Sequence, residues 1–373
     1  MRIGIDARFY GPLGKGLGRY TQKLITYLEK VDQDNDYFIF LRRENWADYQ
    51  PENRRFTKIL ADYHWYTLYE QIFMPLKIWS LKLDIMHFTH FNVPLLYFGR
   101  FVVTIHDLIL TKYPTERAST LGPWLYKIKH IGYQMIISLA VRRAKRIITV
   151  SQCTKKEIAE HFHVSPDKIF ITYEAVDPPQ KKLDNEAMVL SKYSLRRPYL
   201  LYVGNVYPHK NIEGLLAAFK EVLVNKPNYY LVLVGKDDYF FRRIKKEVEL
   251  LELDKNVIFT GFVTDEDLPY LYKNASLYVF PSFYEGFGLP ALEACSYGVP
   301  VAASNSSSLP EVLDKAAFYF DPHDKDDIAK KILRVLDNKE LADELVQNGF
   351  QRISFFSWQK MAQTTLDLYK SYT

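Results

Sequence analysis

The stretch FPSFYEGFGLPALEACSYGVPV, residues 280–301, decides how the rest of this sequence is interpreted. Residues 276–280 predict a strand that leads into it. Pro290 suits the first turn of a helix, because its missing N–H would have no helical partner there. Gly286 and Gly288 lack the Cβ atoms that would keep a ligand away from the backbone. The free N–H groups at such a helix start favour an anion, and we expect a phosphate.

Two glutamates bracket this predicted helix start. Glu285 lies in the loop and Glu293 follows eight residues later, inside the helix. Carboxylates form charge-assisted hydrogen bonds with hydroxyl groups, and a sugar nucleotide carries both the hydroxyls and the phosphate. Acidic residues are also common at helix starts because of the helix dipole, so the spacing alone leaves both explanations open. The neighbouring glycines favour the ligand site.

The chain of 373 residues is too long for one ordinary core. We expect two domains, at 1–180 and 198–352, joined by a polar link. Residues 1–185 hold 27 Lys and Arg against 19 Asp and Glu, a net charge of +8, whereas the remainder holds 22 against 25, a net of −3. A basic first half suggests an acidic substrate or surface, such as anionic lipid headgroups, although a solvated face of mixed charge is the commoner explanation.

The two cysteines, Cys153 and Cys295, fall in separate predicted domains and show no metal-ligand spacing, which fits a reducing compartment. The start MRIGIDARFY has no apolar signal-peptide core, and no segment reads as a membrane span. We therefore expect a cytoplasmic protein, either soluble or peripheral on the inner face of the cell membrane.

In the first domain, two features follow predicted strands. A glycine loop with Gly14 and Gly16 comes after the first strand and precedes a helix from about Arg19 to Lys30. Its spacing matches neither a Walker loop nor a dinucleotide fingerprint, so a structural loop is as good an explanation as a phosphate site. The strand 101–105 ends in His106, at the sheet edge where ligands of parallel sheets bind. We favour a functional His106 over a capping residue.

The strand–loop–helix pattern restarts after the link. Residues 199–203 predict a strand, and Gly204 to Asn211 form a loop before a helix. Lys210 in this loop would reach the phosphates held at the Gly288 helix start; a solvated lysine is the alternative. Short β-branched runs that alternate with helices predict parallel sheets covered on both faces, and hence an α/β fold with two doubly wound, Rossmann-like domains facing across a cleft.

A long helical stretch from about Arg117 to Lys145 mixes bulky apolar residues with basic ones. This composition can place a helix at a lipid interface. A helix that packs on its own sheet with a solvated basic edge is the slightly favoured explanation.

Several motifs together resemble one family. YEGFGLPALEA, with its two glutamates, is similar to the signature of the retaining family-4 glycosyltransferases of GT-B fold. TIHDL, TVSQCTKKEI, YVGNVYPHKN and a closing FFSWQKMA helix extend the resemblance over essentially the whole chain. In this family the final helix, here 357–373, returns to pack on the first domain.

The resemblance implies roles for individual residues. Glu285 would hold hydroxyls of the transferred sugar, Glu293 the donor ribose, and His106 would lie near the transferred sugar. Lys210 and the N–H groups at Gly288 and Leu289 would bind the pyrophosphate. Family members often carry Arg where this chain has Asn205, and a second basic residue where it has His209. In this chain Lys210 would therefore supply most of the positive charge that binds the phosphates. The candidate catalytic residues are His106, Lys210 and Glu285, and the candidate donor-binding residues are Gly14, Gly16, Gly204, Asn205, Lys210, Val263, Gly286, Phe287, Gly288, Leu289 and Glu293.

The resemblance is strongest to mannosyltransferases that build bacterial surface polysaccharides, so it implies transfer of a hexose with retention. GDP-mannose is the first choice of donor, and UDP-sugars remain open because the base contacts, near Phe262 and Val263, cannot be resolved from spacing. A glycan or a lipid-linked glycan is the expected acceptor. No cofactor or metal is expected: the pairs Asp32-x-Asp34 and Asp324-x-Asp326 resemble metal-binding diacids but do not lie at strand ends.

Two other function classes compete with this one. A sugar-nucleotide epimerase of similar shape would need no acceptor, and a non-catalytic sugar-nucleotide-binding subunit would keep only the fold. The joint presence of Glu285, Glu293, Lys210 and His106 argues against a decayed site. Dispersed basic residues without a recognition motif argue against nucleic acid as a partner.

Overall fold

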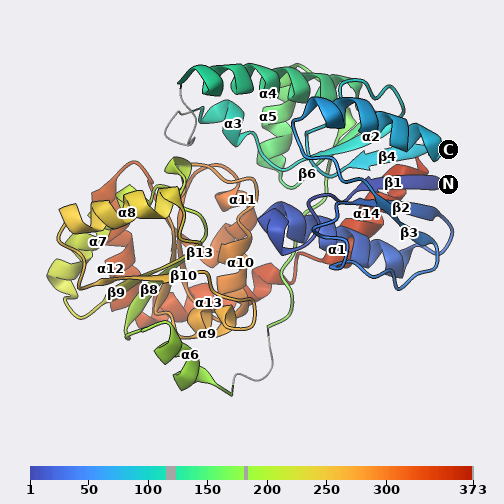
Figure 1. Cartoon of the computed structure of the whole chain (residues 1–373). Helices are drawn as coiled ribbons and strands as arrows, with labels where there is room; N and C mark the ends of the chain where they lie inside the picture. The colour runs from blue at the N-terminus through green and yellow to red at the C-terminus, as the bar shows by residue number, and fades with distance from the viewer. Residues whose placement is uncertain (115–122, 180–183, 372–373) are drawn as a thin grey trace. The chain divides into compact units, whose positions relative to one another are not determined.

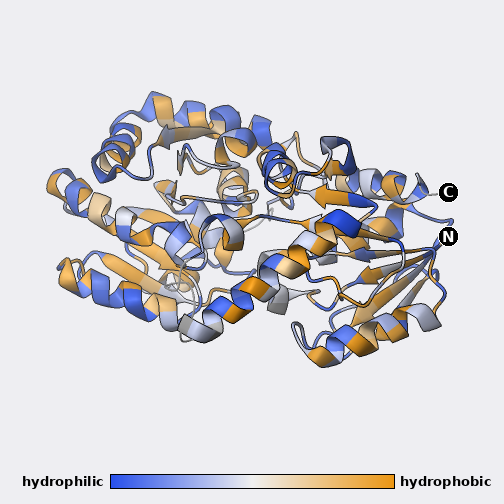
Figure 2. Cartoon of the chain, turned by 90° about the horizontal axis from the view of Figure 1, so that it is seen from above, coloured by the Kyte–Doolittle hydropathy of each residue, from blue (hydrophilic) through white to orange (hydrophobic). Residues whose placement is uncertain are grey.

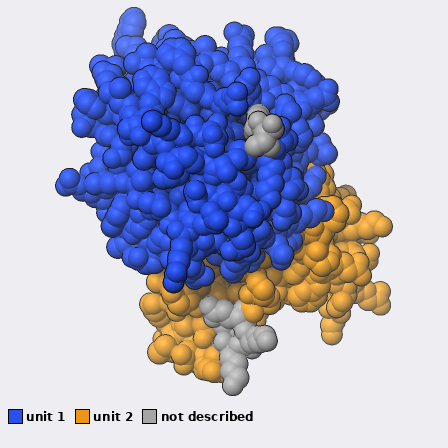
Figure 3. Space-filling view, turned by 90° about the vertical axis from the view of Figure 1, so that its right-hand side faces the viewer, with its two compact units in different colours: residues 1–112, 121–174, 357–373 blue, residues 113–120, 175–356 orange. Residues whose placement is uncertain are grey.

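A computed structural model describes residues 1–114, 123–179 and 184–371. The chain forms two compact units (Figures 1 and 3): unit 1 comprises residues 1–112, 121–174 and 357–373, and unit 2 comprises residues 113–120 and 175–356. We expected the link between the domains at 181–197; in the structure, helix α6 (Glu186–Lys192) already belongs to unit 2.

Unit 1 is built on a seven-stranded parallel sheet with the order β3-β2-β1-β4-β5-β6-β7. Its strands are mostly buried on both faces, which suits a sheet covered by helices on each side. The strands are β1 (Arg2–Asp6), β2 (Asp36–Leu41), β3 (Phe56–Leu60), β4 (Ile85–Phe88), β5 (Phe101–Ile105), β6 (Arg146–Thr149) and β7 (Ile169–Ile171).

Two groups of helices cover this sheet (Figure 1). One core cluster joins the sheet to α2, α4 and α5 through Met74, Ile137 and Ile158, and α1 packs against the C-terminal helix α14. The helices of unit 1 are α1 (Lys15–Val31), α2 (Leu68–Ser80), α3 (Ile109–Lys112), α4 (Pro123–Arg143), α5 (Gln152–Phe162) and α14 (Trp358–Lys370), with 3₁₀ turns at Pro12–Gly14 (η1) and Pro166–Lys168 (η3).

Unit 2 repeats the pattern with a six-stranded parallel sheet of order β10-β9-β8-β11-β12-β13. Its strands are β8 (Tyr199–Val203), β9 (Tyr230–Val234), β10 (Val257–Gly261), β11 (Leu277–Phe280), β12 (Val301–Ser304) and β13 (Ala317–Phe320). Besides α6, its helices are α7 (Ile212–Asn225), α8 (Tyr239–Leu250), α9 (Leu268–Lys273), α10 (Leu289–Ser296), α11 (Leu309–Leu313), α12 (Lys325–Asp337) and α13 (Lys339–Ile353), with 3₁₀ turns at Pro208–Lys210 (η4) and Asp314–Ala316 (η5).

The hydropathy of the chain follows this layering. The strands of both sheets are largely hydrophobic, whereas the helices carry hydrophobic and hydrophilic residues side by side (Figure 2). Two parallel sheets wound with helices confirm the predicted α/β, Rossmann-like class. None of the helices within the described residues is long and apolar enough to cross a membrane.

The predicted helix over 117–145 is seen as α4, and the part of that prediction at 117–122 lies outside the described residues. Ser151 is the N-cap of α5, because its hydroxyl oxygen accepts the N–H of Thr154. The first helix differs: it begins at Lys15 rather than near Arg19, so Gly16 and Gly18 lie in the helix and not in a loop.

The C-terminal helix is tied to the sheet of unit 1 by a buried polar contact. His87, at 0% exposure, contacts the Tyr369 hydroxyl through Nδ1 at 2.5 Å and the Thr104 hydroxyl through Nε2 at 2.8 Å. Burial, aided by His106, lowers the pKa of His87 to about 3. The imidazole is therefore neutral in the folded protein at pH 7.

This buried histidine predicts a loss of stability in mild acid. Because the folded-state pKa lies below the unfolded value, the stabilisation is complete above about pH 6.5 and is lost as the pH falls towards 3. Between pH 6.5 and 5 the free energy of unfolding should fall by up to about 1.4 kcal/mol per pH unit from this group. Urea unfolding at a series of pH values measures the slope, which His87→Gln should reduce and the exposed His161→Gln should leave unchanged. Parallel slopes for wild type and His87→Gln would refute the assignment.

Candidate active site

Three neighbouring strands of unit 2 bring the candidate residues together. In the sheet, β8 pairs with β11 and β11 pairs with β12, all parallel. Lys210 follows β8, Glu285 follows β11, and Ser307 and Ser308 follow β12. Because the carboxyl ends of parallel strands share one edge of a sheet, residues far apart in sequence meet there.

Lys210 and Glu285 form an ion pair at this edge. The Lys210 ammonium nitrogen lies 2.7 Å from Oε1 and 2.8 Å from Oε2 of Glu285. The two side chains are only 13% and 9% exposed, so each charge depends on the other for compensation. The sequence predicted Lys210 near a phosphate and Glu285 near a sugar. In the structure the two side chains contact each other directly.

Hydroxyl and amide groups hold the pair in position. Ser282 donates to Glu285 Oε1 at 2.6 Å, while Ser307 and Ser308 donate to the Glu285 carbonyl oxygen at 2.5 and 2.9 Å. The side-chain amide of Asn211 donates to the carbonyl oxygen of Pro281, which ties the Lys210 turn to the end of β11. None of these four contacts could be predicted from spacing, although Ser307 and Ser308 lie in the serine run SNSSS, residues 304–308.

The start of α10 follows directly. Gly288 is its N-cap with a φ of +104°, a conformation that favours glycine. A Cβ at Gly288 would also lie 2.7 Å from Leu309 Cδ2, so the close packing of α11 needs the glycine too. Leu289 is the first helical residue and Pro290 the second, and the first backbone N–H groups of a helix have no helical partner. The neighbouring residues Gly286 and Phe287 are buried.

Glu293 lies one turn into α10 and is half-buried. Its Oε2 accepts a hydrogen bond of 3.0 Å from the hydroxyl of Tyr272 in α9. The ring of Tyr272 in turn stacks on Tyr297, with centroids 5.8 Å apart and planes 5° from parallel. The carboxylate is thus oriented by a fixed aromatic pair that the sequence analysis did not identify.

The loop after β8 carries less positive charge than its residue types suggest. His209 is buried at 8% exposure, and burial with the neighbouring Lys210 lowers its pKa to about 3. His209 is therefore neutral at pH 7, and Lys210 is the cation of this turn. Gly204 begins the loop with its N–H bonded to the Val234 carbonyl, and the Asn205 Oδ1 atom is buried without a hydrogen-bond partner among the described residues.

Val263 lies beyond the end of β10, in the segment proposed to meet the nucleotide base. Its side chain is buried at 7% exposure, whereas the adjacent Phe262 is 71% exposed. The preceding Gly261 has a φ of +71°, which turns the chain sharply at this strand end. An exposed aromatic ring beside a turn is a surface on which a base could stack.

In unit 1 the glycines that follow β1 have different surroundings. A Cβ at Gly14 would lie 2.0 Å from the Phe9 carbonyl oxygen, and one at Gly18 would lie 2.1 Å from the Gly11 carbonyl oxygen. Gly16 has open space at its Cβ position. The expectation of a glycine loop is thus wrong at Gly16, which lies in α1. At Gly14 and Gly18 the missing Cβ lets the start of α1 approach the segment after β1.

His106 directly follows β5 and is held from two sides. Its Nε2–H donates to the Thr89 carbonyl oxygen at 3.0 Å, and its Nδ1 lies 3.6 Å from Glu174 Oε1. Tyr20 contacts the ring edge-on, with centroids 4.6 Å apart. Because Nε2 carries the hydrogen donated to Thr89, Nδ1 is the ring nitrogen that faces the Glu174 carboxylate. Glu174 lies 68 positions further along the chain, so the sequence gives no signal of this contact.

The two diacid pairs have local structural roles. Asp32 accepts hydrogen bonds from the Asn35 amide and the Tyr37 hydroxyl, both at 2.7 Å. Asp324 is the N-cap of α12 and accepts the N–H groups of Asp326 and Asp327. Within the residues that the structure describes, no cluster of three or more His, Cys, Asp or Glu side chains could hold a metal ion.

Comparison with known proteins covers both units. Residues 14–180 match the sequence pattern of Glycosyltransferase Family 4, and residues 191–352 match that of Glycosyl transferases group 1. O-antigen chain mannosyltransferase B of Escherichia coli is 35% identical over 279 residues, which are 73% of this chain and 70% of that protein. The serotype-specific mannosyltransferase WbdA of Escherichia coli is 34% identical over 74% of this chain, which spans only 33% of the longer protein.

Among solved structures, the sucrose-phosphate synthase of Thermosynechococcus elongatus superposes with a TM-score of 0.76 at 21% identity, over 100% of this chain and 98% of that one. The likeness confirms the predicted GT-B fold. With both sequence patterns and a relative above 30% identity, the resemblance seen in the motifs is confirmed as well, and the chain belongs to glycosyltransferase family 4.

Proposed function

We propose that this glycosyltransferase moves mannose from GDP-mannose to a glycan or a lipid-linked glycan with retention of anomeric configuration. The observation that carries the proposal is the Lys210–Glu285 ion pair beside the start of α10. A cation, a carboxylate and free backbone N–H groups then serve one ligand that has both phosphate and hydroxyl groups. The names of the two mannosyltransferase relatives support mannose as the transferred sugar, and UDP-sugars are the alternative donors.

Each residue then has a distinct task. Lys210 and the N–H groups at Gly288 and Leu289 bind the pyrophosphate, and Glu285 accepts hydrogen bonds from hydroxyls of the sugar. Glu293, oriented by Tyr272, accepts hydrogen bonds from the ribose diol. As the bond between the sugar and the phosphate breaks, negative charge grows on the leaving diphosphate, and the fixed cation and helix start stabilise it without reorganisation.

The chemistry we propose needs no protein nucleophile. The bond from the sugar C1 to the phosphate oxygen breaks, and the acceptor oxygen bonds to C1 on the same face. The acceptor proton passes to the leaving phosphate, so the diphosphate acts as the base. His106 in unit 1, held by Thr89 and Glu174, would lie near the transferred sugar and accept a hydrogen bond at Nδ1 from one of its hydroxyls.

We also propose a peripheral contact with the inner face of the cell membrane. The net charge of +8 over residues 1–185 favours anionic headgroups. A lipid-linked acceptor would be presented at that surface, so the same contact would concentrate enzyme and acceptor together.

Replacing Lys210 tests the leaving-group role. Lys210→Ala should lower kcat by about 10² to 10³, as loss of a group that stabilises developing charge does, and should raise the KM for the donor much less. Lys210→Arg should retain part of the rate because the charge stays. Initial rates over a range of donor concentrations separate kcat from KM.

The exposed Lys220→Ala in α7 is the matched control, and the melting temperature checks that loss of the ion pair has not unfolded unit 2. An unchanged kcat in Lys210→Ala would contradict the assigned role.

Replacing Glu293 tests the donor site. GDP and GDP-mannose should raise the melting temperature selectively within a panel of nucleotides and sugar nucleotides, since a ligand bound only by the folded state stabilises it by RT ln(1+[L]/Kd). Glu293→Ala should abolish the shift, and Glu344→Ala in α13 should keep it. Selective stabilisation by UDP compounds would identify a UDP-sugar as the donor. If no compound stabilised the protein, the proposed donor site would be wrong.

Activity should persist in excess EDTA, because a lysine and a helix start take the place that Mg²⁺ occupies in transferases with a metal-binding diacid. The rate of sugar transfer with and without chelator is the measurement. Loss of activity that added Mg²⁺ restores would show the proposal wrong on this point.

A further inference from the structure

Helix α2 of unit 1 is apolar on two opposite faces. Met74, Pro75 and Ile78 are buried on the sheet side. Six large side chains lie on the other side with exposed fractions of 40–83%, and at 3.6 residues per turn they fall within an arc of about 140°. We call them the α2 outer face: Leu68, Tyr69, Ile72, Phe73, Leu76 and Trp79.

The α2 outer face carries no acidic side chain. Glu70 is the one acidic residue of α2, and it is fully buried. Its Oε1 lies 2.7 Å from the Arg8 guanidinium, and its Oε2 accepts the Tyr66 N–H at 2.8 Å. The exposed part of the helix therefore carries no negative charge, and Lys77 is its one ionic group. A helix on the protein surface normally carries charged and polar residues on the side that faces water.

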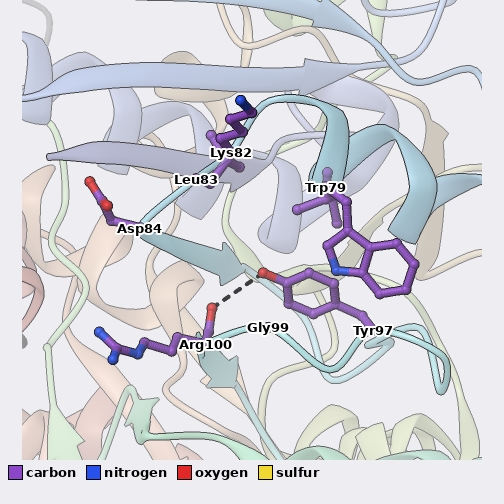
Figure 4. A pocket seen from close by; sticks show the side chains of 8 residues that line it. Trp79, Lys82, Leu83, Asp84, Tyr97, Gly99 and Arg100 are labelled. Atoms are coloured by element: carbon purple, nitrogen blue, oxygen red, sulfur yellow. Dashed lines mark hydrogen bonds between the residues drawn. The ribbon is translucent and has the colours of Figure 1, made fainter.

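A cavity of about 320 Å³ opens at the C-terminal end of the outer face (Figure 4). Trp79 belongs to both the outer face and the cavity wall, which also includes Lys82, Tyr97 and Arg100. Lys82 and Arg100 are exposed, and within the described part of the chain neither forms an ion pair. Asp84 also lines the cavity, and its carboxylate accepts the Arg2 N–H at 2.7 Å, so two cations and one acid line the cavity.

We propose that the α2 outer face and this cavity form one lipid-binding surface. The apolar side chains enter the boundary of the acyl chains, and an anionic headgroup occupies the cavity against Lys82 and Arg100. Tyr69 and Trp79 have the amphipathic rings that favour the interface between membrane and water. The inference rests on the membrane contact proposed above and deepens it by naming the surface and its lipid chemistry.

Charge complementarity favours lipid over a second copy of this chain. A symmetric dimer through the outer face would bring the same patch against itself, and Lys77, Lys82 and Arg100 outnumber Asp84 in each copy, so the contact would concentrate positive charge. Anionic headgroups neutralise these cations instead. This surface is not the one that the sequence suggested. That one is α4, where the exposed Trp124, Ile128 and Ile131 lie among Lys127 and Lys129.

Vesicle sedimentation with the full chain tests the surface. Wild-type protein should pellet with phosphatidylcholine vesicles that contain phosphatidylglycerol, and less so in high salt. Leu68→Ser/Ile72→Ser/Leu76→Ser should lower the partition coefficient at least about tenfold, given the apolar area that three such side chains bury. Lys82→Glu/Arg100→Glu should lower binding to anionic vesicles without changing the weak binding to pure phosphatidylcholine.

Matched controls keep the test specific. Val224→Ser/Leu250→Ser removes equally exposed apolar side chains of unit 2, and Lys246→Glu/Lys255→Glu reverses two exposed charges there; both should bind like wild type. All variants change exposed residues, and an unchanged melting temperature confirms folding.

The outcomes separate the two proposals. If wild type pellets with no vesicle, the membrane contact and the α2 surface both fail. If wild type pellets and the α2 and cavity variants pellet equally well, the membrane contact stands and the α2 surface is overturned. The α2 surface is also overturned if Ile128→Ser/Ile131→Ser in α4 is the only variant that abolishes binding. A dimer that the α2 triple variant converts to monomer, with vesicle binding intact, would assign the face to a second copy and overturn the lipid proposal.

Discussion

The ion pair between Lys210 and Glu285 is the constraint on which the site of unit 2 depends. Burying two opposite charges is costly unless each compensates the other and the remaining hydrogen-bond positions are filled. Here the ammonium meets both carboxylate oxygens, and Ser282 fills a further position. The arrangement exists only because β8 and β11 lie side by side in the sheet. The order of the strands is therefore what places a cation beside a carboxylate at the start of α10.

Positive charge in the turn at the end of β8 is limited to Lys210. His209 is adjacent to Lys210 and could double the positive charge of the turn, but burial keeps it neutral. The Asn205 side chain adds a polar atom without a charge. A diphosphate at this edge would thus be met by one ammonium and by backbone N–H groups, so the helix start at Gly288 carries a larger share of the stabilisation than in relatives with more basic residues.

What the sequence predicted well is local in the chain. The Gly288 turn and the alternation of strands and helices follow from neighbouring residues, and the structure has them. Ser307, Ser308, Tyr272 and Glu174 were missed because they contact their partners across the fold, where spacing gives no signal. The start of the first helix was misplaced because glycine is typical both of an open loop and of a close approach of two backbones. The contacts of Gly14 and Gly18 with the Phe9 and Gly11 carbonyl oxygens show the second. The outer face of α2 was missed for a related reason: apolar residues on two faces of a helix look, in sequence, like a helix buried all round.

The central claim is that this site transfers mannose from GDP-mannose with retention, and proton NMR of the reaction tests it most directly. The enzyme would be incubated with GDP-mannose and a methyl α-mannoside as a soluble glycan acceptor, while the anomeric signals of donor and product are followed. The account predicts loss of the donor signal and the growth of one new α-linked mannoside signal that depends on Lys210 and Glu285. A β-linked product, or a donor converted to an epimer in the absence of acceptor, would contradict it.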